Sequence, residues 1–485
     1  MNGPTRRLAT SLFLGFLVLL GSVTWIQVIG VDRYRDDPRN ARTSISESGK
    51  ERGIIVAVDG TVLARSEPDP EDAQSFLRVY PAGPAFAPIV GYTSRLAGSA
   101  GLERGFAEEL RSRRDLTPSD LLAALFGRDL RPRSLQVTIL PELQQAAYDA
   151  LGGARGAVVA IDPATGDLLA YVTSPSFDPQ TLTGDDAVAV REELLADPDE
   201  PTRDRAGNEL VRPGSTFKTI VTAAAFETGT YTPETTFADT AAFQLPGSEA
   251  SIANADGNPC GNGREVTVQT AFVRSCNTVF AALAIEIGAP QIGRIAERFG
   301  FGESIELPWS TTASLFPTEE LEQDPAALGQ SGIGERDVRA TPLQMAMVAA
   351  TIANGGETMT PRVVSQIFDA DGETVESFEP RSLGNPISQP VADTMSELME
   401  RVVTEGTGRR AAVPGVRVAG KTGTAEGVEG APDVWFIGFA PVENPRIAIA
   451  VMVEDGGDAG GSATGGGVAA PIAATVIDRW LSIRP

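Results

Sequence analysis

Two of the three lysines in this chain lie in short motifs that place an amine close to a hydroxyl group. The sequence has 40 basic residues, of which only Lys50, Lys218 and Lys421 are lysines. An arginine keeps its proton, whereas a lysine loses its proton when burial or a nearby cation lowers the pKa of the amine. The positions of the lysines are therefore informative about chemistry.

The first motif is Ser215-Thr-Phe-Lys218, at the predicted start of an apolar helix over residues 216–226. One helical turn brings residues i and i+3 onto the same face, so the Lys218 amine can reach the Ser215 hydroxyl. A serine becomes a good nucleophile when a base takes its proton, and the chain has no histidine for that task. For an isolated Ser-x-x-Lys, a helix N-cap with an exposed lysine is the commoner explanation.

The second and third motifs lie further along the chain. Ser275-Cys-Asn277 places a hydroxyl and an amide two residues apart, so that in a loop both can project together. Lys421-Thr422-Gly423 lies in a predicted strand over residues 416–424 and is followed by Thr424. Each motif alone also fits a polar loop, or a strand whose glycine allows close backbone approach. The scarcity of lysine elsewhere favours a chemical role.

Composition excludes several other kinds of site. The chain has no histidine and only two cysteines, so it cannot build a Ser-His-Asp triad, a His-ligated zinc site or a four-cysteine metal site. The net charge of -24 repels a phosphate backbone. We therefore expect no nucleic-acid partner, and the chemistry must use carboxylates, hydroxyls, lysines or a cofactor.

An uncharged segment near the N-terminus predicts a membrane anchor. Residues 8–30 carry no charge, and at about 1.5 Å per residue they span roughly 34 Å, enough to cross a bilayer. No A-x-A site closes the segment, which favours an uncleaved anchor over a signal peptide. Residues 1–7 then form a tail and residues 31–50 a juxtamembrane linker. More arginines follow the segment than precede it, so the arginine count alone would place the far side in the cytoplasm.

The soluble part divides into two predicted units with an α+β fold. The first, residues 51–134, contains a hairpin that turns at Asp59-Gly60. The second, residues 135–485, begins with a helix and a hairpin and ends with three strands and a helix, which predicts a central antiparallel sheet flanked by helices. Its expected strands are 156–162, 168–172, 416–424, 434–439 and 447–453, and its expected helices include 141–151 and 468–481.

Ser-x-x-Lys, Ser-x-Asn and Lys-Thr-Gly in this order resemble the penicillin-binding proteins and serine β-lactamases. The resemblance extends along the chain to the class B penicillin-binding proteins, and within them to the short actinobacterial members. The segments that carry it are Arg52-Gly53 with Asp59-Gly60, Gly101-Leu-Glu-Arg104, Pro213-Gly-Ser-Thr-Phe-Lys218, Gly329-Gln330 with Thr341-Pro-Leu-Gln-Met345, and Trp435-Phe-Ile-Gly-Phe439.

The resemblance implies an acyl-serine D,D-transpeptidase, for which we expect no metal and no cofactor. Ser215 would attack the carbonyl of the penultimate D-alanine of a peptidoglycan stem peptide, with Lys218 as general base. Ser275 would relay a proton to the leaving amine with the help of Lys421. Asn277 would bind the amide of the donor peptide.

The remaining implied roles concern the substrate's charged groups and the antibiotics. Thr422, Gly423 and Thr424 would bind the substrate carboxylate together with the charge of Lys421. The backbone N–H groups of Ser215 and Thr424 would form the oxyanion hole, which is worth several kcal/mol in a transition state. A β-lactam would acylate the same serine and remain trapped on it.

The resemblance also implies a location and a partner. The substrate lies outside the cytoplasmic membrane, so the N-terminus would be cytoplasmic and the catalytic domain extracytoplasmic, despite the arginine count. The first unit, with Arg52, Asp59 and Glu103, resembles a pedestal that contacts a polytopic glycosyltransferase of the RodA/FtsW type. The alternative for these three charges is ordinary surface and turn chemistry.

The exterior location makes a disulfide between Cys260 and Cys276 possible, and we expect it to steady the Ser275 loop. The alternative is two small buried side chains.

Other functions fit parts of the sequence. Residues 415–422 match a phosphate-loop pattern, but the residues between its glycines read as a strand and no helix is predicted after Thr422. A D,D-carboxypeptidase, a β-lactam-binding sensor or a secreted β-lactamase would share the three motifs. An anchor and a pedestal are unnecessary in a secreted β-lactamase.

Overall fold

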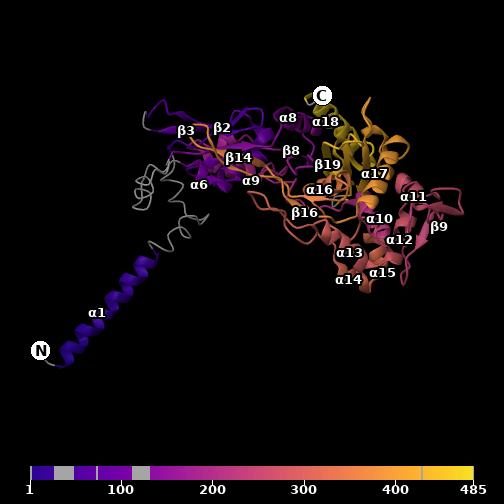
Figure 1. The fold of residues 1–485 in the computed structure, drawn as a ribbon, viewed down its shortest axis with the longest axis horizontal. Helices are drawn as coiled ribbons and strands as arrows, with labels where there is room; N and C mark the ends of the chain where they lie inside the picture. Colours follow the sequence, from indigo (N-terminus) through magenta and orange to yellow (C-terminus); the bar gives the residue numbers. More distant parts are fainter. Residues whose placement is uncertain (1–2, 27–48, 73–74, 112–130, 428–429, 484–485) are drawn as a thin grey trace.

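The computed structural model describes residues 3–26, 49–72, 75–111, 131–427 and 430–483 (Figure 1). Helix α1, Gly3–Thr24, has a mean hydropathy of 1.7 and no buried residue, which fits a single membrane-spanning helix. It begins at Gly3 rather than at Leu8 because Pro4 suits a first helical turn. The predicted anchor residues 27–30 and most of the predicted linker lie outside the described residues.

A five-stranded antiparallel sheet forms the centre of the second predicted unit, which confirms the predicted fold class. Its strands, in spatial order, are β17 (Ala419–Ala425), β18 (Asp433–Ala440), β19 (Ile447–Val453), β7 (Gly156–Ile161) and β8 (Leu168–Ser174). Nearly every residue of these strands is buried, because helices cover both faces. Strand β17 forms one edge of the sheet.

Alternate residues of the sheet pack into two hydrophobic cores. Trp435 and Ile437 of β18 face one core, to which helix α16 (Pro342–Ala353) also belongs. Val434 and Phe436 face the other, with helices α8 (Pro141–Leu151) and α18 (Ala469–Ile483). The period of two along a strand therefore places one core on each side of the sheet.

A group of helices extends the first core and carries much of the site. Its members are α10 (Lys218–Phe226), α11 (Val268–Arg274), α12 (Asn277–Ile287), α13 (Ala289–Arg298), α14 (Thr318–Gln323), α15 (Pro325–Ser331) and α17 (Gln389–Thr404). The short strand pairs nearby are β9 (Thr236–Ala238) with β12 (Glu265–Thr267), β10 (Ala242–Gln244) with β11 (Ser251–Ala253), and β13 (Thr358–Met359) with β16 (Ser382–Gly384).

Short helical turns and one further helix complete the second predicted unit. They are η3 (Pro179–Leu182), α9 (Ala187–Ala196), η4 (Gly214–Phe217), η5 (Arg409–Ala411) and η6 (Glu454–Ser462). Figure 1 shows β2, β3 and β14 toward one end of the body and α11, α12 and α15 toward the other, with β8 and β19 between them.

The pedestal is built on a six-stranded sheet that crosses the predicted boundary at residue 134. Its strands, in spatial order, are β15 (Thr374–Ser377), β14 (Val364–Phe368), β6 (Ser134–Val137), β1 (Ile55–Val56), β2 (Val62–Pro68) and β3 (Phe76–Val79). Strands β14 and β15 come from the second predicted unit; β14 pairs with β6, and β15 pairs with β14. The two units therefore share a sheet.

The rest of the pedestal is short helices and turns. They are η2 (Pro84–Phe86), α4 (Ala87–Val90), β4 (Thr93–Ser94), β5 (Gly98–Ser99), α5 (Gly101–Gly105) and α6 (Ala107–Leu110).

Two of the three pedestal charges are buried rather than surface groups. Glu103 is fully buried and its carboxylate accepts hydrogen bonds from Arg52 Nε at 2.9 Å and Arg78 Nε at 2.5 Å. Ordinary surface chemistry is therefore wrong for Arg52 and Glu103. It describes Asp59, whose exposed carboxylate accepts from the Thr61 N–H in the predicted β-turn.

Candidate active site

Ser215 lies in a single 3₁₀ turn, η4, that leads directly into helix α10. The regular helix thus begins at Lys218, later than the sequence predicts. Glycines allow strand β17 to approach this turn closely. A Cβ on Gly214 would lie 2.6 Å from Thr424 O, and a Cβ on Gly423 would lie 2.7 Å from Pro213 O. The Ser215 turn and the Lys-Thr-Gly strand therefore pack main chain against main chain.

Lys218 is fully buried and its amine contacts the Ser-x-Asn motif. Lys218 Nζ lies 2.8 Å from Ser275 O, 2.8 Å from Asn277 Oδ1 and 3.4 Å from Ser275 Oγ. Among the hydrogen bonds of the described residues, none joins Lys218 to Ser215. A neutral amine has two N–H donors, and the two short bonds use both. The lone pair then remains to accept a hydroxyl proton.

Both lysine amines of the site are easier to deprotonate than an ordinary lysine. Burial lowers the pKa of Lys218 well below its usual range, and the positive charge of Lys421 lowers it further, while the Glu335 carboxylate opposes the shift. Burial lowers the pKa of Lys421 to about 7. A neutral base is therefore accessible near neutral pH.

The Ser275 hydroxyl lies between the two lysines. Lys421 Nζ donates to Ser275 Oγ at 2.9 Å and to Thr422 O at 3.0 Å. Ser275 ends helix α11 with φ 63°, in the left-handed region. This conformation is uncommon for a residue with a side chain and is frequent at functional sites. Lys218, Ser275, Asn277 and Lys421 are thus brought together.

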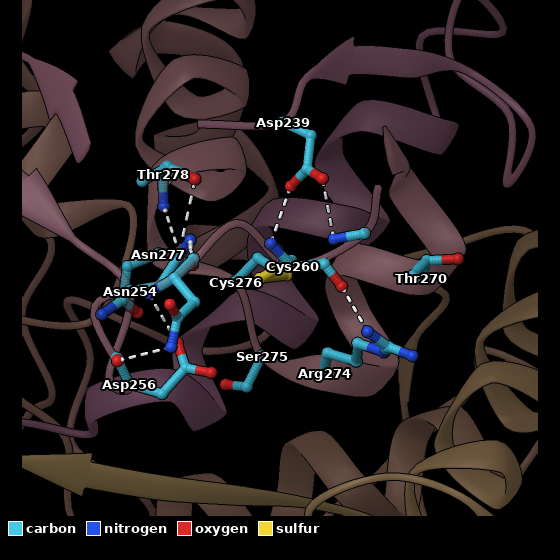
Figure 2. Close-up of a disulfide and its surroundings, with 12 residues drawn as sticks. Asp239, Asn254, Asp256, Cys260, Thr270, Arg274, Ser275, Cys276, Asn277 and Thr278 are labelled. Atoms are coloured by element: carbon cyan, nitrogen blue, oxygen red, sulfur yellow. Dashed lines mark hydrogen bonds between the residues drawn. A yellow bond between two sulfur atoms is a disulfide. The ribbon is translucent and has the colours of Figure 1, made fainter. Parts of the chain in front are cut away.

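The predicted cysteine pair forms a disulfide beside this cluster (Figure 2). Cys276 stands between Ser275 and Asn277 and is almost fully buried. On the other side, the Asp239 carboxylate accepts hydrogen bonds from the backbone N–H groups of Cys260 at 2.7 Å and Gly261 at 2.8 Å. The bridge therefore joins the Ser-x-Asn motif to an anchored loop.

Asn277 is engaged at both ends of its side-chain amide. Its Oδ1 accepts from Lys218, and its Nδ2 donates to Ala253 O at 3.0 Å. An amide nitrogen carries two hydrogens. One hydrogen of Nδ2 is thus used within the protein, and the second can donate to another acceptor.

The threonines of β17 have partners that sequence reasoning missed. Thr422 Oγ1 lies 2.6 Å from Thr407 Oγ1, so a second hydroxyl joins the motif. Thr424 is exposed, and its Oγ1 accepts from the Gly465 N–H at 3.1 Å, which leaves its hydroxyl hydrogen free to donate.

Sequence comparison assigns this arrangement to a family. The sequence profile of the penicillin binding protein transpeptidase domain matches residues 156–478. The chain belongs to the penicillin-binding transpeptidase family. A second profile, the penicillin binding protein A dimerisation domain, matches residues 52–134.

Two relatives of this penicillin-binding protein match along nearly their whole length. The peptidoglycan D,D-transpeptidase PbpA of Mycolicibacterium smegmatis is 40% identical and covers 98% of both chains. The protein of the same name from Mycobacterium tuberculosis is 39% identical and covers 100% of both chains.

Solved structures of M. tuberculosis penicillin-binding protein A agree with the fold. Its ceftriaxone acyl-enzyme complex has a TM-score of 0.82 at 38% identity and covers 90% of this chain and 99% of its own. Its penicillin G acyl-enzyme complex has a TM-score of 0.81 at 39% identity and covers 89% of this chain and 100% of its own.

Proposed function

We propose that this penicillin-binding protein is a serine D,D-transpeptidase that cross-links peptidoglycan stem peptides and is acylated by β-lactams. The observation that carries the proposal is the Ser275 hydroxyl, which lies between two buried lysine amines beside the Ser215 turn. The names of the relatives and the acyl-enzyme structures of the M. tuberculosis protein support the same activity over a carboxypeptidase or a sensor.

In the first half-reaction, Ser215 Oγ attacks the carbonyl carbon of the penultimate D-alanine of the donor peptide. Lys218 takes the hydroxyl proton through its lone pair. The proton then passes through Ser275 Oγ to the nitrogen of the leaving D-alanine. The C–N bond breaks, D-alanine leaves, and the acyl group remains as an ester on Ser215.

In the second half-reaction, the amine of another stem peptide attacks the ester carbonyl. Lys218 takes a proton from this amine, and the Ser215 oxygen regains a proton as the ester bond breaks. The new amide bond is the cross-link. A β-lactam acylates Ser215 by the same first step, but its ring nitrogen stays attached to the acyl group and cannot leave.

Substrate binding uses the edge of strand β17. The backbone N–H groups of Ser215 and Thr424 stabilise the oxyanion, as their segments' close packing allows. The charge of Lys421 and the hydroxyls of Thr422 and Thr424 bind the substrate carboxylate, with Gly423 keeping the strand close. Asn277 Nδ2 donates its remaining hydrogen to an amide oxygen of the stem peptide that is being cleaved.

The N-terminal tail is cytoplasmic, α1 crosses the membrane and the catalytic domain is extracytoplasmic. The disulfide supports this orientation, because disulfides persist in oxidising compartments outside the cytoplasm. The pedestal, residues 51–134, contacts a polytopic glycosyltransferase of the RodA/FtsW type. The dimerisation-domain profile over residues 52–134 agrees with a protein-binding role for the pedestal.

Mass spectrometry of the full chain after treatment with benzylpenicillin tests the function. We expect one added penicilloyl group on Ser215 and none in the Ser215→Ala variant. Ser176→Ala, which changes a half-buried serine whose hydroxyl donates to Pro84 O, is the control and should be acylated like the wild type. Labelling at another residue, or no labelling of the wild type, would contradict the proposal.

A further inference from the structure

Three chain segments meet beside the nucleophile. The Gly214 N–H donates to Gly334 O at 3.0 Å, and a Cβ on Gly334 would lie 1.8 Å from Gly214 O. On the other side, a Cβ on Gly214 would lie 2.6 Å from Thr424 O. The Ser215 turn is therefore packed between the backbone at Gly334, next to Glu335, and strand β17.

Strand β17 is supported by a neighbouring strand on one side only. Its pairing with β18 ends at Ala425, which lies opposite Asp433, and β17 forms the edge of the sheet. Glu426 is the first residue beyond this ladder. The position of the peptide after β17 must therefore depend on other contacts.

Two side chains bind the backbone of Glu426, one at its N–H and one at its carbonyl. Glu335 Oε1 accepts from the Glu426 N–H at 3.3 Å, and Arg212 Nη1 donates to the Glu426 carbonyl at 2.8 Å. Arg212 is itself tied to the sheet, because its carbonyl accepts from Trp435 Nε1 at 3.0 Å. In the described part of the chain, these are the hydrogen bonds of the Glu426 peptide.

We propose that Glu335 and Arg212 are positioning residues for acyl transfer, which together fix the peptide after β17 and so keep the Thr424 N–H aligned with Ser215. The inference rests on the proposed function, in which the Thr424 N–H is half of the oxyanion hole. Glu426 is two residues from Thr424, so movement of its peptide is transmitted directly along the strand. Among the hydrogen bonds of the described residues, none joins either side chain to Ser215 or Lys218.

The charges around Glu335 make glutamine a suitable replacement. Burial raises the pKa of Glu335 to about 7. The hydrogen bond from the Glu426 N–H and the Arg212 and Arg339 guanidinium groups oppose the shift, and the Glu426 carboxylate adds to it. Lys218 on α10 is a further charged group in electrostatic reach of Glu335. Glutamine has the shape of glutamate and keeps a carbonyl oxygen in the place of Oε1, so it can still accept from the Glu426 N–H.

Stopped-flow acylation of the full chain in detergent by a fluorescent penicillin tests the inference. The measurement separates the acylation rate constant from the dissociation constant of the initial complex. We expect Glu335→Ala and Arg212→Ala to lower the rate constant about tenfold and to change the dissociation constant less than about threefold, because a misplaced donor affects the transition state.

The conservative and control variants distinguish positioning from a general loss of stability. Glu335→Gln keeps the acceptor and should retain the rate constant within about threefold of wild type. Glu426→Ala keeps the backbone groups that Glu335 and Arg212 bind and removes only the side chain. Its acylation rate constant should therefore stay within about twofold of wild type. Thermal unfolding of each variant checks the fold, and Arg212→Ala carries the test if Glu335→Ala does not fold.

Three results would overturn the inference: a wild-type rate constant in Glu335→Ala or Arg212→Ala, a Glu335→Gln variant as slow as Glu335→Ala, or an equal loss in Glu426→Ala. An unreactive wild-type chain would instead overturn the proposed function.

Discussion

At the scale of single residues, the two lysines of the site differ in what surrounds their amines. Lys218 donates to two oxygens, and the Lys421 charge lowers its pKa beyond the effect of burial. The pKa of Lys421 falls to about 7 through burial alone. The Lys421 charge therefore favours a neutral Lys218 amine beside it, so that the site holds one neutral base and one cation.

A neutral Lys218 beside a charged Lys421 predicts a bell-shaped pH profile for acylation by penicillin. The rate should fall toward acidic pH as Lys218 gains a proton and ceases to act as a base. It should also fall as the pH rises above about 7, because Lys421 loses the charge that binds the carboxylate. Stopped-flow measurements from pH 5 to pH 10 check this, and a rate that rises continuously to pH 10 would contradict these roles.

At the scale of elements, the loop that carries Ser275 is stabilised from outside the site. The disulfide joins Cys276 to a loop that the Asp239 carboxylate anchors (Figure 2). Since Ser275 and Asn277 flank Cys276, this bridge and the left-handed turn at Ser275 together determine where both side chains lie.

Loss of the disulfide should lower stability and slow acylation together. The bridge spans 16 residues of sequence, for which the chain-entropy relation gives about 3 kcal/mol of unfolding free energy. We expect Cys260→Ala/Cys276→Ala to lose about this amount in chemical denaturation. Reductant should reproduce the loss in the wild type and leave the double variant unchanged. An equally stable double variant would disprove the structural role.

The approach of residue 334 to the Ser215 turn gives a second prediction at this scale. A Cβ at Gly334 would collide with Gly214 O, so Gly334→Ala should displace the turn and lower the acylation rate at least about 100-fold. Gly60→Ala is the matched control, because Gly60 has a similar positive φ but open space around it. Equal acylation rates in both variants would show that the contact does not matter.

At the scale of the whole molecule, the pedestal and the catalytic domain share a sheet and are not linked by a simple tether. Strands β14 and β15 leave the catalytic domain to pair beside β6, and β6 pairs in parallel with β1. The buried Glu103 carboxylate, with two arginines, lies within the pedestal.

Removal of the Glu103 charge should destabilise the pedestal. Glu103→Gln leaves Arg52 and Arg78 buried without a counter-charge, which typically costs about 3–5 kcal/mol. Glu67→Gln, which breaks an exposed pair with Arg65, should cost at most about 1 kcal/mol. Thermal unfolding of the full chain measures both, and a Glu103→Gln variant as stable as Glu67→Gln would contradict the buried role.

The sequence predicted the elements well where their signals are local. The hairpin at residues 156–172, the strands near residues 434–453 and the C-terminal helix all appear close to their predicted bounds. The exchange of β14 and β15 into the pedestal was not predicted, because strand pairing across more than 200 residues leaves no local pattern.

The sequence by itself determined the chemical groups of this protein. Three short motifs, a lysine-poor composition and the absence of histidine pointed to a serine paired with an amine, since each motif depends on neighbours within one helical turn or loop. Only the tertiary structure decided which groups surround them. Thr407 lies 15 residues from its partner Thr422, and Arg212 and Glu335 lie 214 and 91 residues from Glu426, whose backbone they bind. Such contacts arise from packing rather than from any local period.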